Sequence, residues 1–119
     1  MLDINPEPAA EALSVEEVIS CLRQRWRATY DLQLVVRRDR LYLQVMWAYL
    51  EQQSFPMDEF TYREHIADVL DVVNRLGLAA EVREWLATTR DKPRLGKALS
   101  LHLNVRGDAA DSLLKEFLV

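Results

Sequence analysis

One short segment concentrates positive charge in an otherwise acidic chain. Residues 90–97, Arg-Asp-Lys-Pro-Arg-Leu-Gly-Lys, hold four cations and one carboxylate, whereas the whole chain has 15 Lys and Arg against 19 Asp and Glu. Guanidinium and ammonium groups bind carboxylates, phosphates and anionic membrane surfaces. Pro93 restricts the backbone and Gly96 permits a tight turn, so we expect a rigid loop. The residues that we expect to form a docking surface are Arg90, Lys92, Arg94, Gly96 and Lys97.

The alternative for this loop is a structural role. Arg94 or Lys97 could pair with a carboxylate of the acidic helix that we expect over residues 58–76. Exposed ion pairs contribute little to stability, so the sequence gives equal weight to docking and to bracing.

Signatures of catalysis and of metal binding are absent from the sequence. A phosphate-binding loop ending at residues 96–97 would need a glycine and a hydroxyl residue where Asp91 and Ala98 stand. His65 has no second histidine four residues on, and His102 is the only other histidine, so we expect both to be surface residues. We therefore predict no catalytic residue, no metal site and no cofactor.

The hydrophobic pattern predicts the elements that position these side chains. Apolar residues recur at helical spacing in three segments, and a short amphipathic helix is expected after Gly107. Alternating residues predict a hairpin around residues 38–39 and a third strand after Lys97. The order α-β-β-α-α-β-α predicts an α+β domain with a small three-stranded sheet covered by helices on one face. The three longer helices are expected at about 15–27, 58–76 and 79–89.

The hairpin register separates two faces of the sheet. Centring the turn on residues 38–39 pairs Val36 with Leu41, Leu34 with Leu43 and Leu32 with Val45, which gives one aliphatic face that Trp47 would extend. The other face mixes apolar and hydrogen-bonding groups, as interfaces do. Alternatively, the C-terminal helix covers it. The candidates on this face for contacting a partner are Val35, Tyr42 and Met46.

Six arginines between residues 22 and 47 make RNA binding an alternative function. The groups at 23–27 and 37–40 lie at opposite ends of a strand of roughly 23 Å, so they form one patch only if residues 90–97 bridge them. The sequence pI of about 5.2 also disfavours nucleic acid as the partner.

The chain has the length of one ordinary domain. We expect an acidic mobile arm over residues 1–13 and a single α+β domain over 14–119. One cysteine among 119 residues suits a reducing compartment, and we see neither a signal peptide nor a membrane-spanning run. We therefore expect a cytoplasmic protein. Peripheral contact with a membrane is compatible with this location.

Three segments carry a resemblance to a known family: Leu-Gln-Val-Met-Trp-Ala-Tyr-Leu-Glu-Gln-Gln-Ser-Phe-Pro-Met at 43–57, Tyr-Arg-Glu-His at 62–65, and Lys-Pro-Arg-Leu-Gly-Lys-Ala-Leu-Ser at 92–100. Over about residues 15–105 the chain resembles a small family, a domain of unknown function, found in cyanobacteria and chloroplasts. The resemblance implies an oxygenic phototroph and a cytoplasmic or stromal location. It assigns no functional residue.

The functional expectation combines both kinds of observation. The residues favour a non-enzymatic interaction protein with a protein partner, and the resemblance implies an accessory or assembly factor for photosynthetic machinery. RNA binding is the alternative, and an enzyme without a recognisable signature is the third possibility.

Overall fold

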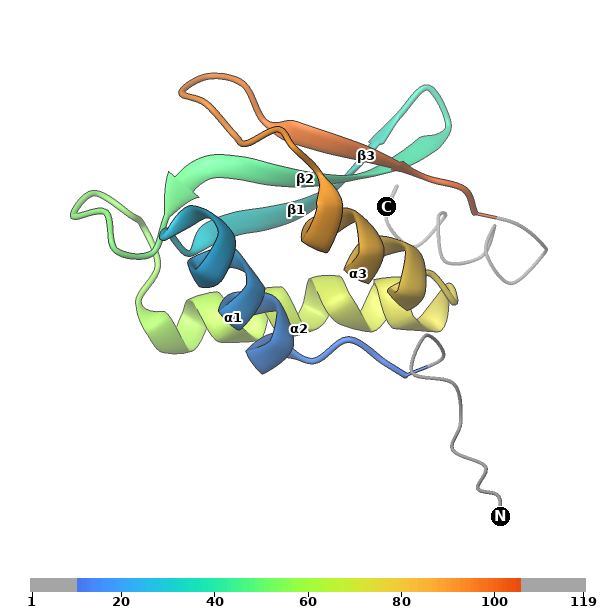
Figure 1. Cartoon of the computed structure of the whole chain (residues 1–119), viewed down its shortest axis with the longest axis horizontal. Coiled ribbons are helices and arrows are strands. Elements are labelled where there is room, and N and C mark those ends of the chain that lie inside the picture. Colours follow the sequence, from blue (N-terminus) through green and yellow to red (C-terminus); the bar gives the residue numbers. More distant parts are fainter. Residues whose placement is uncertain (1–10, 106–119) are drawn as a thin grey trace, which may run out of the picture.

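The computed structural model describes residues 11–105, which form three helices and three strands. The strands make one antiparallel sheet in the order β1-β2-β3, and the helices lie together on one side of it (Figure 1). This arrangement confirms the α+β fold, while the helix expected after Gly107 lies outside the described residues. In chain order, the elements are α1 (Val15–Trp26), β1 (Tyr30–Arg37), β2 (Arg40–Tyr49), α2 (Glu59–Arg75), α3 (Ala79–Thr88) and β3 (Leu99–Leu103).

The start of α1 is attached to the core through the residue that precedes its cap. The Ser14 hydroxyl accepts a hydrogen bond from the Glu17 amide at 3.1 Å, which caps the helix. Leu13 is 5% exposed, and its backbone exchanges two hydrogen bonds with the Asn74 side chain at 2.8 and 3.0 Å. Of the expected acidic arm, residues 1–10 lie outside the described residues, and the described end of the arm packs on α2. The single-domain organisation stays a prediction.

Helix α2 lies within the predicted range of residues 58–76. The Asp58 carboxylate accepts a hydrogen bond from the Thr61 amide at 2.8 Å, and this bond lowers the pKa of the Asp58 carboxyl below its ordinary value. Gly77 has a φ of +75°, which ends the helix because glycine adopts this left-handed conformation without steric cost. The α2 side chains that enter the core are Tyr62, Ile66, Val69, Leu70 and Val73.

The hairpin between β1 and β2 has the predicted register. Arg38 and Asp39 have φ values of +53° and +63°, as a two-residue type I′ turn requires. Arg37 consequently pairs with Arg40, and the aliphatic pairs follow as expected. Beyond the pair of Leu32 with Val45 the register shifts, and Tyr30 pairs with Tyr49. Trp47 lies in this irregular stretch and is only half-buried, so it does not extend the paired core face as expected.

Strand β3 pairs with β2, on the side away from β1. Strand β2 is therefore the central strand of the sheet. Both β1 and β3 are edge strands of the described sheet. Each strand points one row of aliphatic side chains toward the helices. The fully buried members of these rows are Leu32, Leu41, Leu43, Val45 and Leu103.

Candidate functional site

Several arginines act as structural braces on the helix side. Arg25 Nη1 donates to the Leu86 carbonyl at 2.8 Å and Arg25 Nη2 donates to the Thr89 carbonyl at 2.6 Å. These carbonyls lie at the C-terminal end of α3, where the helix leaves acceptors unpaired and where a cation is stabilised by the helix dipole. Arg25 therefore closes α3 and joins it to α1.

A second brace fixes the start of β1. The Thr29 amide and hydroxyl donate to the Glu51 carboxylate at 2.9 and 2.5 Å, and Arg23 Nε donates to the Thr29 hydroxyl at 2.9 Å. Burial raises the pKa of the Glu51 carboxyl, but these hydrogen bonds and the nearby Arg23 charge together lower it below its ordinary value. Arg23 and Arg25 are thus engaged within the protein, which removes them from the arginine group at 23–27 considered for RNA.

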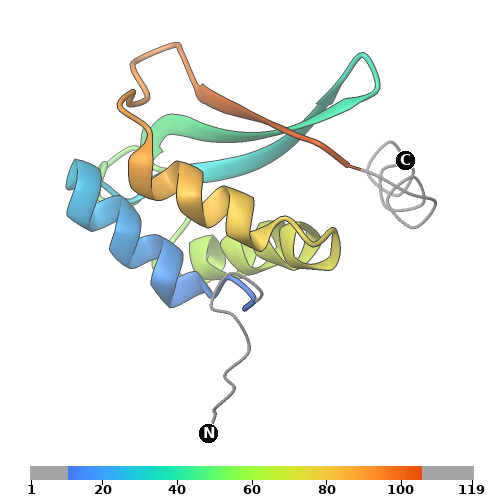
Figure 2. The ribbon, with the colours of Figure 1, turned by 45° about the vertical axis from the view of Figure 1, so that its right-hand side comes forward.

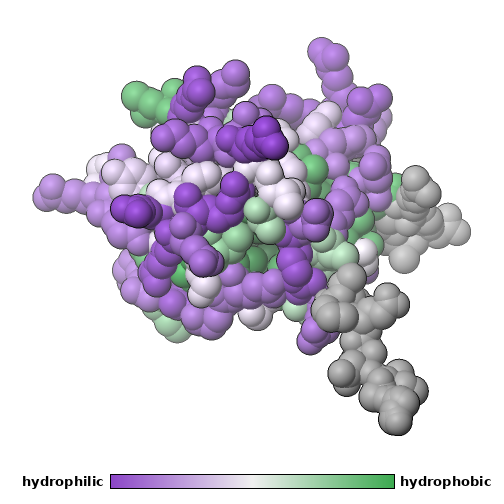
Figure 3. Space-filling view, in the orientation of Figure 1, coloured by the Kyte–Doolittle hydropathy of each residue, from purple (hydrophilic) through white to green (hydrophobic). Residues whose placement is uncertain are grey.

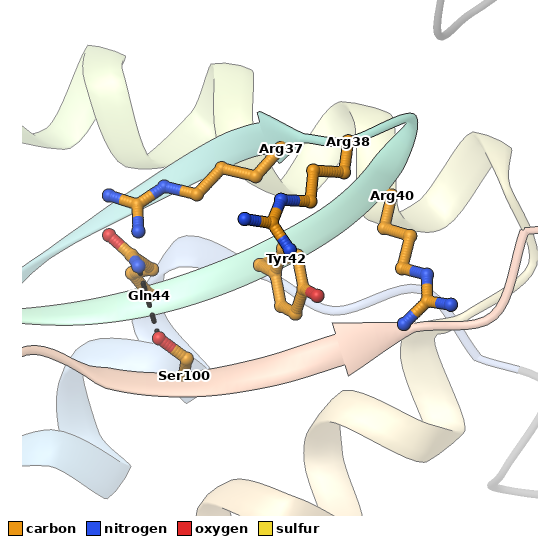
Figure 4. Close-up of a pocket in the computed structure, with 6 residues that line it drawn as sticks. All are labelled: Arg37, Arg38, Arg40, Tyr42, Gln44 and Ser100. Carbon is orange, nitrogen blue, oxygen red and sulfur yellow. Dashed lines mark hydrogen bonds between the residues drawn. The ribbon is translucent and has the colours of Figure 1, made fainter.

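A different set of arginines surrounds a hollow on the outer face, the side of the sheet that faces away from the helices. The hollow has a volume of about 490 Å³. Figure 4 shows the Arg37 and Arg38 side chains running back from the turn above Gln44 and Tyr42, whereas Arg40 extends toward β3. We call this site the arginine pocket; its lining residues are Arg37, Arg38, Arg40, Tyr42, Gln44 and Ser100.

Polar groups from β2 and β3 form the floor of the arginine pocket. Gln44 Nε2 donates to the Ser100 hydroxyl at 3.0 Å, since these residues lie opposite each other in the ladder. Beside them the rings of Tyr42 and His102 lie 5.2 Å apart and inclined by 39°. The floor thus offers one aromatic surface and a pair of hydrogen-bonding side chains.

The guanidinium groups of the arginine pocket have no acidic partner within residues 11–105. The ion pairs described there use Arg23, Arg63, Arg75, Arg83 and His65, and none includes Arg37, Arg38 or Arg40. Arg37 and Arg40 are directly paired across the hairpin and Arg38 lies in the turn between them, so three cationic residues gather at this end of the sheet. An external anion would complement this positive charge.

The basic loop at 90–97 is a tight turn at the other end of the sheet (Figure 2). The backbones of Arg94 and Lys97 exchange hydrogen bonds of 3.0 and 2.7 Å, and Gly96 has a φ of +78°. Pro93 is buried, while Leu95 at the tip is 89% exposed. Pro93 and Gly96 thus form a turn as expected, while the rigidity of the loop stays a prediction.

None of the loop cations pairs with a carboxylate in the described part of the chain. The expected alternative, pairing of Arg94 or Lys97 with the acidic helix, is therefore not observed there. Arg90, Lys92, Arg94 and Lys97 are all exposed. Docking through this loop stays a prediction.

The structure brings together only some of the residues expected at the site. Tyr42 lies in the arginine pocket with Val35 as its neighbour across the ladder. Met46 falls in the irregular stretch at the far end of β2, near the loop at 90–97. Tyr42 and Met46 are four residues apart in β2, which corresponds to roughly 13 Å along the strand. The residues expected at one site therefore lie toward opposite ends of the sheet.

Sequence reasoning missed the three arginines of the pocket as a site, although the signal was present. The hairpin register already places Arg37 and Arg40 on the face that carries Tyr42, because residues two apart in a strand share a face. Which way the Arg38 side chain turns depends on its left-handed backbone, which the sequence does not reveal.

His65 differs from its expected role as a surface residue. Its Nε2 lies 2.7 Å from the Leu32 carbonyl and 3.2 Å from Asp31 Oδ1, and the side chain is only 33% exposed. Asp31 is 5% exposed and also accepts from Gln33 Nε2 at 3.2 Å. The expectation failed because the helical pattern gives no sign of a polar acceptor at the neighbouring sheet edge. His102 is exposed on the outer face, as predicted.

The face of the protein seen in Figure 3 is mostly polar. Figure 3 shows hydrophilic residues over most of one face, with hydrophobic colour between α1 and α3. In residues 11–105, no three His, Cys, Asp or Glu side chains gather as a metal site would require. Nor does any helix of that region have the length and apolarity needed to cross a membrane.

Comparisons with known proteins place the fold in a family. The solution NMR structure of the Alr2454 protein from Nostoc sp. strain PCC 7120, a cyanobacterium, matches with a TM-score of 0.74 and 36% sequence identity. The match covers 90% of this chain and 98% of the Nostoc chain. The search of curated proteins found no match. A family model, the domain of unknown function DUF3067, matches residues 16–114. The chain therefore belongs to the DUF3067 family.

Proposed function

We propose that the protein is a non-enzymatic interaction protein whose arginine pocket binds an acidic segment of a protein partner. The observation that carries the proposal is the set of three guanidinium groups, Arg37, Arg38 and Arg40, around a hollow of about 490 Å³. None of the three forms an ion pair with a carboxylate of residues 11–105. A carboxylate from a partner would form charge-assisted hydrogen bonds with these groups.

The composition of the pocket supports a protein partner. Arginine and tyrosine are enriched at protein interfaces, where they combine a large contact area with directed hydrogen bonds. Tyr42 supplies the ring, and Gln44 with Ser100 supplies donors and acceptors that could orient a backbone. The pocket lies on a paired sheet, so these groups are held in place before binding and lose little freedom.

RNA binding is the second candidate, and one observation favours it. The rings of Tyr42 and His102 lie on an open sheet face beside three arginines, and aromatic rings next to cations bind single-stranded nucleic acid through stacking and phosphate contacts. The net charge of −4 opposes a long nucleic-acid contact. We therefore rank this candidate below an acidic protein segment.

The wider role that we propose is that of an accessory or assembly factor for photosynthetic machinery, acting in the cytoplasm or the chloroplast stroma. Its support is the similarity to the Nostoc protein, since cyanobacteria are oxygenic phototrophs. Affinity capture from a cyanobacterial lysate, with and without its membranes, tests this role. Recovery of photosynthetic subunits by the native chain, and not by a pocket variant, is the expected result.

The direct test compares two variants that each remove three positive charges. One is Arg37→Gln, Arg38→Gln and Arg40→Gln in the pocket; the matched control is Arg90→Gln, Lys92→Gln and Arg94→Gln in the loop. The probe is a fluorescent peptide with a run of glutamates. We expect the pocket variant to lose about tenfold or more in affinity, because several charge-assisted contacts disappear, and the control to change less than about twofold.

The same pair of variants separates the alternatives. If the loop variant loses the peptide and the pocket variant keeps it, docking belongs to the loop and the pocket proposal is wrong. Titrations with a single-stranded RNA test the second candidate, because phosphate contacts make affinity fall steeply with salt. RNA binding that exceeds peptide binding and depends on the pocket arginines would replace the acidic segment with RNA.

A further inference from the structure

The free edge of β1 presents backbone groups that no described strand uses. In a two-residue hairpin, the pair next to the turn, here Arg37 with Arg40, exchanges both backbone hydrogen bonds, and the next pair exchanges none. The pairs then alternate along the ladder. The amides and carbonyls of Leu32, Leu34 and Val36 therefore point away from β2, toward the open edge.

His65 confirms this direction and marks where the free edge ends. Its Nε2 lies 2.7 Å from the Leu32 carbonyl, and His65 belongs to α2, which runs alongside β1 rather than within the sheet. The Leu32 carbonyl thus already has a partner on the open side. What remains available for a new strand is the stretch with Leu34 and Val36.

A groove lies between this edge and α2, with a volume of about 380 Å³. Leu34 from the edge and Val69 and Val72 from the helix give it an apolar lining. The helix side chains lie at spacings of three, four and seven residues from His65, which is one face of a helix. We call this site the edge groove; its lining residues are Gln33, Leu34, His65, Asp68, Val69 and Val72.

The carboxylates beside the edge groove favour a positively charged ligand. On α2, the surface carboxylate of Asp71 lies 3.5 Å from Arg75, and that of Glu59 lies 3.0 Å from Arg63. Asp68 in the groove has no cationic partner within residues 11–105, and Glu64 one turn earlier has none there either. A cation from a ligand would complement both.

We propose that the edge groove binds an extended, basic segment of a second protein as an added strand on β1. The backbone of the segment pairs with Leu34 and Val36, an apolar side chain enters the groove against Val69 and Val72, and a lysine or arginine lies near Asp68. This mode takes its affinity from backbone hydrogen bonds and its specificity from alternate side chains. Because His65 already contacts the Leu32 carbonyl, the added strand can pair only with Leu34 and Val36. Such a short ladder gives a small interface, which is typical of transient complexes.

The edge groove takes a ligand of opposite charge to that of the arginine pocket, and the two sites share no lining residue. Two proteins, or two segments of one protein, could therefore be held at the same time.

The test uses an acetylated hexapeptide with threonine at positions 1, 3 and 5 and with valine, lysine and valine at positions 2, 4 and 6, so that valine and lysine share the face toward the groove. The peptide is titrated into the full chain and followed by the amide resonances in NMR spectra. We expect saturable shifts at Leu34, Val36 and the α2 residues of the groove. Asp68→Lys should weaken binding by about tenfold, because an attraction becomes a repulsion. The control Asp71→Lys makes the same charge change outside the groove and should alter affinity by less than about twofold.

Two further peptides test the added strand itself. A hexapeptide with N-methylated valines keeps its charge but loses the donors of the ladder, and we expect it not to bind. The same hexapeptide with glutamate in place of lysine should bind only the Asp68→Lys variant. Absence of saturable shifts at millimolar peptide, shifts confined to the outer face, or pairing of two β1 edges in a dimer that excludes the peptide would each overturn the proposal.

Discussion

Arginines on the two sides of the sheet have different surroundings. On the helix side, Arg25 caps α3 and Arg83 holds the Glu17 carboxylate at 2.5 Å. On the outer face, the three arginines of the pocket lie together without a carboxylate in the described region. The same residue type thus joins elements where the chain supplies an acceptor, and stays available for binding where it supplies none.

The two groups of arginines differ in the hydrogen bonds and ion pairs that a mutation would remove. A helix-side arginine satisfies carbonyls and carboxylates that would otherwise be left unpaired near the core, so its removal carries a desolvation cost. An outer-face arginine without a partner stabilises nothing that the structure describes. The comparison therefore predicts that mutations on the helix side change stability and that mutations on the outer face change binding.

The largest effect should come from two neighbouring residues on opposite faces of β2. Leu43 is fully buried, so Leu43→Ala should leave a cavity and cost about 2–5 kcal/mol of unfolding free energy. Tyr42→Ser should cost less than about 1.5 kcal/mol but weaken peptide binding. Chemical denaturation and peptide titration measure the two quantities. Equal destabilisation by both variants would show that the outer face of β2 contributes to stability as much as the helix side does.

An intermediate effect should separate two arginines. Arg25→Gln removes two charge-assisted hydrogen bonds to the end of α3, and we expect it to cost about 1–3 kcal/mol. Arg37→Gln has no such bonds to lose and should leave the unfolding midpoint within the range of ordinary surface changes, about 0.5 kcal/mol. If Arg37→Gln proved the more destabilising of the two, the pocket would be a structural brace.

The smallest effect concerns acid sensitivity on the helix side. The hydrogen bond from Arg83 lowers the pKa of the Glu17 carboxyl below its ordinary value. A carboxyl with a depressed pKa in the folded state stabilises the protein above its unfolded pKa, and this contribution disappears as the pH falls through the folded pKa. Glu17→Gln should therefore be less stable than the native chain at pH 7, and the difference should vanish near pH 2.

The control for acid sensitivity is Glu84→Gln on α3, whose side chain makes no contact with a cation in residues 11–105. We expect the same small stability change at every pH for this variant. Urea unfolding midpoints between pH 2 and pH 7 provide the measurement. A stability gap for Glu17→Gln that is independent of pH would show that the loss arises from packing.

The fold was largely predictable because its signals are local. The ranges of the three helices and the pairs on either side of residues 38–39 follow from local spacing, and the structure reproduces the helix bounds to within one residue and the pairs as expected. Trp47 was misplaced because a register shift interrupts the alternation after Val45. Nothing in the local pattern marks such a shift.

The sites were less predictable because they depend on contacts between distant residues. The sequence shows Arg37 to Arg40 only as a group of cations at the hairpin turn. The arrangement of three strands is needed to show that Ser100 and Gln44 form a floor beneath them. Asp31 and His65 are 34 positions apart, and a strand and a helix must pack before they meet. Charge patterns in the sequence indicated cations, but not which of them would remain unpaired.

The turn at Arg38 and Asp39 affects both the stability of the hairpin and the number of cations in the arginine pocket. Non-glycine residues in the left-handed conformation are strained by roughly 1 kcal/mol each, and Asn-Gly is the pair that fits a type I′ turn best. Replacing the two residues with Asn-Gly would thus make the hairpin more stable and delete one guanidinium of the pocket in the same step. A screen that rewards thermal stability alone would select that change and discard a binding group.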